Sequence, residues 1–153
     1  RTLNIILGPD NKVYTYPGSV KAEDLAAVPP ILPPLSETDF SAEGIRKILL
    51  DKNRMLARKI IEFNKQVISG KIPISQDSAR NSISALKNDD DTGPIVLIKA
   101  YDKANYGNFV DILDEMNICG IASYMFTKIA WYEEKMVEAA AGITPTATSS
   151  NNQ

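Results

Sequence analysis

Three aspartates near an apolar, strand-like run are the residues of this 153-residue chain that come nearest to an acid–base pair. Asp102 follows the run, and Asp111 and Asp114 stand three residues apart in a helix-like segment. Two carboxylates can divide acid and base roles only when both reach the same substrate. The spacing places Asp111 and Asp114 on the polar side of a helix and Asp102 in the preceding loop. We therefore expect no catalytic residue and no enzyme activity.

The residues for other common site chemistries are also missing. A phosphate site at a helix start needs glycines that let backbone amides approach, and "AYDKANYGN" offers only Gly107, inside the helix. The chain has no histidine and one cysteine, Cys119, which argues against zinc binding, triad catalysis and an internal disulfide. The acidic run 89–91 lacks the glycine and distal glutamate of a calcium loop. We expect no metal, no cofactor, and a buried Cys119 rather than a reactive one.

The net charge of −2 is unevenly distributed along the chain. Residues 41–70 contain seven basic and three acidic side chains (+4), whereas residues 89–140 contain ten acidic and four basic ones (−6). We expect two solvated faces that attract each other. No basic patch with interleaved aromatic residues is visible in the sequence, so we expect no nucleic-acid partner.

Alternating apolar residues predict a hairpin at the start of the chain. Its strands are expected at residues 3–7 and 12–16, joined by the turn 8–11. Four prolines then remove backbone donors and restrict φ. We interpret residues 28–38 as a stiff connector that forms no element of its own.

Residues 41–69 carry apolar side chains in steps of three, four and seven, which predicts one long helix. Lys52 and Asn53 interrupt this stripe, so the turn they occupy is expected either to be exposed or to bend the helix. Residues 71–93 show a weaker helical pattern with an acidic end. We interpret them as an inserted region.

The segment "IVLIKAYDKANYGNFVDILDEMNICGI" predicts a strand, a helix and a second strand. Residues 95–98 are consecutive and apolar, as in a strand buried on both faces. Asn105 can cap the helix, Gly120 can end it in the left-handed conformation, and residues 121–127 resume as a strand. This order makes a right-handed βαβ crossover. The side chains expected to face inward are Phe109, Val110, Leu113 and Met116, with Tyr106 closing the core end of the helix.

Together these patterns predict an α+β fold (α/β-like). A small mixed sheet combines the N-terminal hairpin with the C-terminal βαβ unit, and the helices pack on one face. The segment "AWYEEKMVEAAA" is either a short final helix or an extended arm. We expect residues 1–141 to form one domain and the polar residues 142–153 to form a disordered tail.

The segment 95–126 resembles the stretch by which ExbD and TolR proteins are recognised. Both have a buried strand ending in Ile-Lys-Ala, an acidic loop, an Asn-Tyr helix start, a Val-Asp-x-Leu-Asp-x-Met helix face and a Gly-Ile break. In this family an acid usually follows Lys-Ala directly, whereas this chain has Tyr101 there. The motif residues are Lys99, Asp102, Tyr106, Asp111, Asp114 and Gly120.

This resemblance implies an accessory subunit of a proton-driven inner-membrane motor of the ExbB–ExbD–TonB type, which transmits energy to TonB for outer-membrane transport. The chain would be the periplasmic domain of a single-pass protein, with the anchoring helix and the proton-carrying aspartate preceding Arg1. The implied domain is a mixed sheet with helices on one side. The implied partners are a second copy of the chain, an ExbB-type membrane subunit and a TonB-type protein.

Contacts with such partners are expected at exposed sheet edges, where an extended segment can add as a further strand. Two alternatives stay open at this point. One is a TolR-like subunit of the Tol-Pal envelope system, and the other is a small α/β domain that binds a ligand at the crossover. The candidate edge residues are Asn4, Ile6, Val13, Tyr14, Tyr16, Tyr124 and Phe126.

Overall fold

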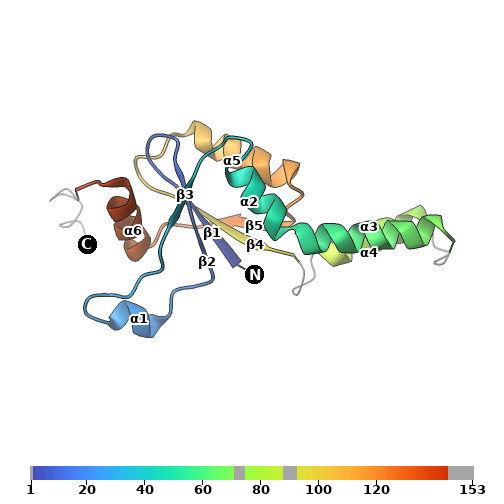
Figure 1. Cartoon of the computed structure of the whole chain (residues 1–153), viewed down its shortest axis with the longest axis horizontal. Coiled ribbons are helices and arrows are strands. Elements are labelled where there is room, and N and C mark those ends of the chain that lie inside the picture. The colour runs from blue at the N-terminus through green and yellow to red at the C-terminus, as the bar shows by residue number, and fades with distance from the viewer. Residues whose placement is uncertain (1, 71–74, 88–92, 145–153) are drawn as a thin grey trace.

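A mixed five-stranded sheet with the strand order β3-β2-β1-β4-β5 forms the centre of the computed structural model, which describes residues 2–70, 75–87 and 93–144 (Figure 1). The predicted α+β class is confirmed. The strands are β1 (Thr2–Leu7), β2 (Val13–Pro17), β3 (Ser36–Thr38), β4 (Ile95–Ala100) and β5 (Ser123–Phe126). The helices are α1 (Ala22–Ala26), α2 (Ile45–Lys52), α3 (Arg54–Ile68), α4 (Gln76–Lys87), α5 (Gly107–Ile118) and α6 (Trp131–Ala141).

The predicted hairpin is present as β1 and β2, which pair antiparallel. In its turn the amide of Gly8 donates to the carbonyl oxygen of Lys12 at 2.9 Å. Asp10 and Asn11 adopt φ values of 58° and 60°, in the left-handed region that these two residue types tolerate better than most. The polar turn in the sequence therefore marks a real reversal of the chain.

The crossover is also present, because β4 and β5 pair in parallel and α5 connects them. β4 pairs in parallel with β1 as well, over all six residues of each strand. On the other side, β3 adds antiparallel to β2. The prediction that residues 28–38 contain no element was wrong at their end, because the residues beyond Pro34 again carry backbone donors.

Each face of the sheet has its own apolar core, because side chains alternate between the faces along a strand. Figure 1 shows α2 and α5 together on one side of the sheet. The core on that side includes Leu3, Ile5, Leu7, Ile45, Leu49, Ile112 and Met116. The core on the other side includes Ile6, Tyr14, Tyr16, Tyr101, Met136 and Val137. The expectation that helices cover one face only was wrong, because α6 contributes Met136 and Val137 to the second face.

The long helix predicted at residues 41–69 is divided at Asn53 into α2 and α3. Asn53 is buried, and its side-chain amide donates to the carbonyl oxygen of Cys119 at 3.0 Å. This bond ties the bend to the C-terminal end of α5. Of the two alternatives left open by the sequence, an exposed turn or a bend, the structure has the bend, and the side-chain nitrogen of Asn53 has a partner inside the protein. Cys119 itself is buried, as expected.

Beyond the bend, α3 and α4 pack together as an arm that extends away from the sheet (Figure 1). α4 occupies part of the predicted insertion 71–93. Residues 71–74 and 88–92, with the acidic run, and the tail residues 145–153 lie outside the described residues. α6 settles the alternative for the last segment as a helix, which ends at Gly142 with a φ of 69°.

Replacing Gly120 with alanine is expected to lower the free energy of unfolding by about 1–2 kcal/mol, because Gly120 has a φ of 67° and a Cβ is strained in that conformation. The measurement is the midpoint of urea denaturation. Gly107→Ala is the control, because its Cβ would meet only the side-chain oxygen of Asn105, at 3.4 Å. Equal midpoints for the two variants would contradict a conformational role for Gly120.

Candidate functional site

The three aspartates that could have formed an acid–base pair are all exposed, on the outer side of α5 and in the loop before it. Asp111 and Asp114 lie on α5, and Asp102 lies in the loop. Among the described residues, no group of three or more His, Cys, Asp or Glu side chains is arranged to hold a metal ion. The three carboxylates therefore face solvent and belong to neither apolar core.

Five of the seven candidate edge residues do not lie at an edge. Asn4 and Ile6 belong to β1, which is the central strand, because β4 pairs with the side that β2 leaves open. Val13 and Tyr14 belong to the part of β2 that β3 covers, and Tyr16 is buried in the second core. The error has a simple cause: β4 begins about ninety residues after β1, and a hairpin pattern carries no information about such a distant neighbour.

The strand β5 lies at an end of the sheet, with β4 on one side and no described strand on the other. Tyr124 and Phe126 pair with Val96 and Ile98 of β4, which belong to the core beneath α5. Tyr124 and Phe126 therefore point toward the α5 side of the sheet. Phe126 is 41% exposed and stacks on the ring of Phe109 with 5.6 Å between the ring centroids.

The outer side of α5 extends this exposed apolar area. Val110 and Leu113 were expected to face inward, but Val110 is 51% exposed and Leu113 is exposed as well. Tyr106 was expected to close the core end of α5, but it is 80% exposed, with its ring 6.0 Å from that of Phe109. We call the combined area the edge surface, and it consists of Tyr106, Val110, Leu113, Tyr124 and Phe126.

The inward side of α5 contributes Ile112 and Met116 to the core and also forms an ion pair with α2. Nε and Nη2 of the Arg46 guanidinium donate to the two carboxylate oxygens of Glu115 at 2.9 and 2.8 Å, and Glu115 is buried. The paired Glu115 raises the pKa of Arg46. The inward side of α5 contains Ile112 and Glu115. A buried carboxylate needs a charged or hydrogen-bonding partner, and Arg46 is that partner for Glu115. Arg46 and Glu115 also join the basic and acidic segments that were expected to attract each other.

A second polar cluster lies buried between α6 and the sheet. The ammonium group of Lys99 donates to the side-chain oxygen of Asn4 at 2.6 Å and to a carboxylate oxygen of Glu133 at 2.7 Å. The hydroxyl of Tyr16 donates to the same carboxylate oxygen of Glu133 at 2.7 Å. The side-chain amide nitrogen of Asn4 donates in turn to the backbone oxygens of Tyr16 and Gly18, at 3.2 and 2.6 Å. Three strands and one helix thus meet in one hydrogen-bonded network.

This network has a structural function, because its polar groups satisfy one another. The side chains of Lys99 and Glu133 are 7% and 1% exposed, so solvent contributes little to either charge. The other carboxylate oxygen of Glu133 accepts from the backbone amide of Ala130 and so caps α6. Lys99 belongs to the motif residues predicted from the sequence. Glu133 was missed, although a lysine within an apolar strand signals that some buried acid must accompany it.

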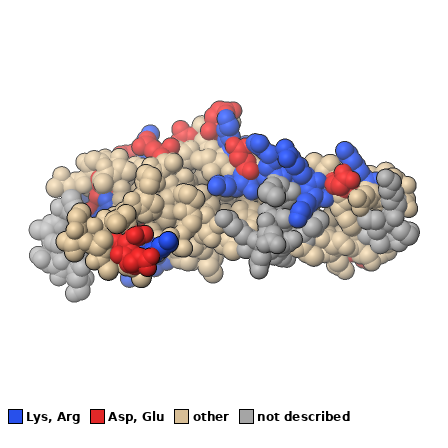
Figure 2. Space-filling model, turned by 60° about the horizontal axis from the view of Figure 1, so that its bottom comes forward, with Lys and Arg blue, Asp and Glu red and all other residues tan. Residues whose placement is uncertain are grey.

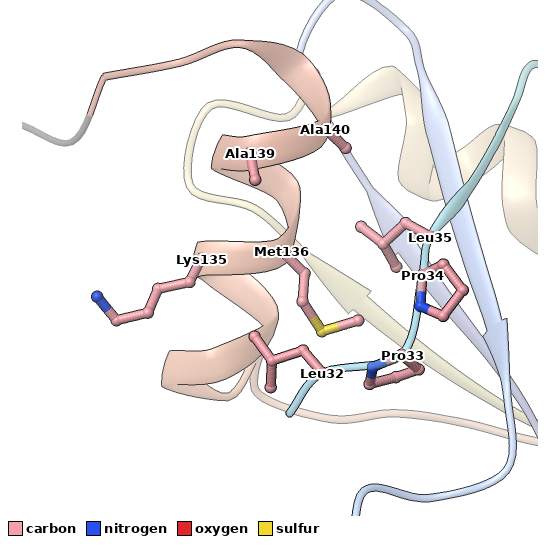
Figure 3. A pocket seen from close by; sticks show the side chains of 8 residues that line it. All are labelled: Leu32, Pro33, Pro34, Leu35, Lys135, Met136, Ala139 and Ala140. Carbon is pink, nitrogen blue, oxygen red and sulfur yellow. The ribbon is translucent and has the colours of Figure 1, made fainter. Parts of the chain in front are cut away.

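The segment rich in proline packs along α6 on the same face. A hollow of about 360 Å³ lies between α6 and this segment (Figure 3). The segment lines the hollow with Leu32, Pro33, Pro34 and Leu35. The lining of the hollow from α6 consists of Lys135, Met136, Ala139 and Ala140. The apolar side chains of Leu32 and Leu35 pack against the second core. The proline-rich segment and α6 therefore cover that core together.

Comparisons with protein-family models, with curated proteins and with solved structures found no match for this chain. Within the described ranges, no helix combines the length and the apolar character needed to cross a membrane. The likeness of residues 95–126 to ExbD and TolR proteins remains a resemblance of sequence, and what it implies about function is a proposal.

Replacing Glu133 with glutamine is expected to lower the free energy of unfolding by about 3 kcal/mol or more, because Lys99 would keep a buried charge without its counter-charge. The measurement is urea denaturation at neutral pH. The matched control is Glu134→Gln on the exposed side of α6, with an expected change below about 0.5 kcal/mol. Similar losses in the two variants would show that the buried pair has no special role.

A second prediction concerns alkaline pH. Burial, and then the hydrogen bond to Glu133, raise the pKa of Tyr16 above its usual value of 10.0. Above pH 10 the unfolded chain therefore binds fewer protons than the folded one, and stability falls as the pH rises. The stability that Tyr16 contributes is fully present below pH 10.0, the usual pKa of a tyrosine in the unfolded chain. Urea denaturation at several pH values above and below 10 measures the slope.

The comparison variant for this slope is Tyr16→Phe, which has no phenol to ionise. The stability of this variant should fall less steeply with pH than that of the wild type. Loss of the hydroxyl also lowers its free energy of unfolding at neutral pH by about 1 kcal/mol. Burial also raises the pKa of Tyr14, Tyr101 and Tyr132, so a smaller decline persists. Identical slopes in wild type and variant would exclude Tyr16 as a source of the pH dependence.

Proposed function

We propose that this chain is the periplasmic domain of an ExbD-like accessory subunit in a proton-driven inner-membrane motor, and that it docks partner proteins at the β5 edge. The observation that carries the docking proposal is the edge surface, where an edge strand lies beside exposed aromatic and aliphatic side chains. The identity of the motor is inferred from the sequence motif at residues 95–126. The proposed partners are a second copy, an ExbB-type subunit and a TonB-type protein.

Strand addition is the binding mode that this edge supports best. An edge strand presents backbone donors and acceptors that an extended peptide can pair with, largely independently of the peptide's sequence. Specificity would come from side chains at every second position of the peptide, because these would lie beside Tyr124 and Phe126. The expected ligand is therefore an extended segment with alternating apolar residues. Val110 and Leu113 would add contact area above it.

The connection from β5 into the domain suits a subunit that transmits motion. β5, β4 and β1 are consecutive in the sheet and pair in parallel, so a pull on β5 is shared by two hydrogen-bonded ladders. The buried Lys99 and Glu133 then connect β4 to α6. A membrane anchor before Arg1 belongs to the proposal. A single apolar helix containing one aspartate in the preceding residues would support it.

The direct test is a titration of the domain with a TonB-type periplasmic fragment, followed by amide chemical shifts. We expect the largest shifts at Ser123–Phe126 and on the outer side of α5. The variant Val110→Lys/Tyr124→Lys should weaken binding about tenfold, because a bound partner would have to desolvate the added charges.

The matched control is Val28→Lys/Ile31→Lys, which makes the same change at two exposed apolar residues away from the edge surface. This control should bind like the wild type. If β5 amides do not shift at millimolar fragment, docking at this edge is wrong. If both double variants weaken binding equally, the effect reflects net charge and the edge surface is not the site.

A further inference from the structure

One row of exposed side chains on α3 contains three cationic and two apolar residues. Consecutive members are four, three, four and three residues apart, so they lie along one side of the helix. All of them are exposed, and Ile68 is 86% exposed. The members of this row, which we call the arm row, are Arg54, Arg58, Ile61, Lys65 and Ile68.

The opposite side of α3 accounts for the packing of the arm. Ile60, Phe63 and Val67 lie there and are half-buried, and α3 packs against α4. Contact with α4 therefore leaves the arm row uncovered. Ile61 and Ile68 are 55% and 86% exposed, so packing within the arm does not fully account for two isoleucines on this row.

The arm row contains three cationic side chains and no acidic one. α3 contains four basic side chains and one acidic side chain, Glu62. Arg54 pairs with Asp51, but Arg58 and Lys65 form no ion pair with any residue that the structure describes. Figure 2 shows Lys and Arg side chains gathered where α2 continues into the arm. An anionic partner fits this surface.

The partner must also accept isoleucines in the same plane as the cations. From Arg54 to Ile68 the row is straight and about 21 Å long, at about 1.5 Å per residue. The boundary between headgroups and acyl chains of a bilayer offers anionic phosphates and apolar chains side by side over such a length. Arginine and lysine can reach the phosphates while shorter apolar side chains enter the boundary. We propose that the arm row binds the surface of an anionic lipid bilayer.

This inference does not depend on the proposed function. The arm row lies on α3, whereas the edge surface lies on α5 and β5. Lipid binding by the arm would hold the domain close to a membrane whether or not a partner is docked at β5. The two surfaces can therefore be tested separately, and either can fail alone.

The test is co-sedimentation of the 153-residue chain with vesicles of phosphatidylcholine alone, or of three parts phosphatidylcholine to one part phosphatidylglycerol. We expect binding to the anionic vesicles only, and its loss at about 1 M salt, where the Debye length is about 3 Å. Arg58→Glu/Lys65→Glu should weaken binding tenfold or more, because each cation near the surface contributes about fivefold. Ile61→Ser/Ile68→Ser should weaken binding at constant charge.

The matched control is Lys128→Glu/Lys135→Glu, which changes the net charge equally at two exposed lysines outside the arm. It should retain most of the binding. Equal losses in the two charge-reversal variants, or no binding of the wild type to anionic vesicles, would overturn the proposal. Binding to soluble polyglutamate that matches the vesicle affinity and is unaffected by Ile61→Ser/Ile68→Ser would also overturn it, in favour of an acidic polypeptide partner.

Discussion

The ion pair between Lys99 and Glu133 is almost entirely buried, and it lies at the centre of the contacts on the second face of the sheet. Lys99 projects from β4 and Glu133 from the first turn of α6, and their charged atoms are 2.7 Å apart. Burial of either charge alone would cost several kcal/mol. Asn4 and Tyr16 complete the cluster by hydrogen bonds from β1 and β2. The position of α6 on the sheet follows from this cluster together with the apolar contacts of Met136 and Val137.

On the other face, a second ion pair joins Arg46 of α2 to Glu115 of α5. It lies on the same inward side of α5 as the buried Ile112 and Met116. The outward side contains Val110 and Leu113, and Phe109 stacks on Phe126 of the edge strand β5. The pair of Arg46 and Glu115 thus joins α2 to α5 on the side away from these exposed apolar side chains. The combination of aromatic residues and a strand at the end of the sheet is the basis of the proposed docking of a protein partner.

The sheet and the arm have different relations to the core. The central strands β1 and β4 are buried on both faces, and the helices α2, α5 and α6 protect them. The arm, by contrast, packs mainly on itself and is tied to the body at the bend, where Asn53 bonds to the backbone of Cys119. An element that adds little to the core and presents an ordered row of cations and isoleucines is better explained by contacts outside the domain than by stability.

Most of the elements, β3 excepted, could be predicted from local sequence. The hairpin, the crossover, the bend near Asn53 and the end of α5 at Gly120 each depend on residues within one turn or one strand, where backbone sterics and hydrophobic periodicity act. The sequence alone also argued against a phosphate site, because the expected helix start lacks the necessary glycines, and against a zinc site, because the chain has no histidine. These predictions needed no knowledge of which elements would meet.

Only the tertiary structure decided which strands became edges and which side of α5 turned inward. The sequence predicted that β1 is an outer strand, but β4, far along the chain, pairs with its open side. β3 follows the last proline of the connector and covers part of β2. Six apolar residues spread around α5 allowed several orientations, and packing against the sheet and α2 placed Ile112, Met116 and Glu115 inward. Pairing over long sequence separations depends on the sum of many contacts, so no single segment contains the information. The surfaces available to partners are therefore a property of the assembled fold.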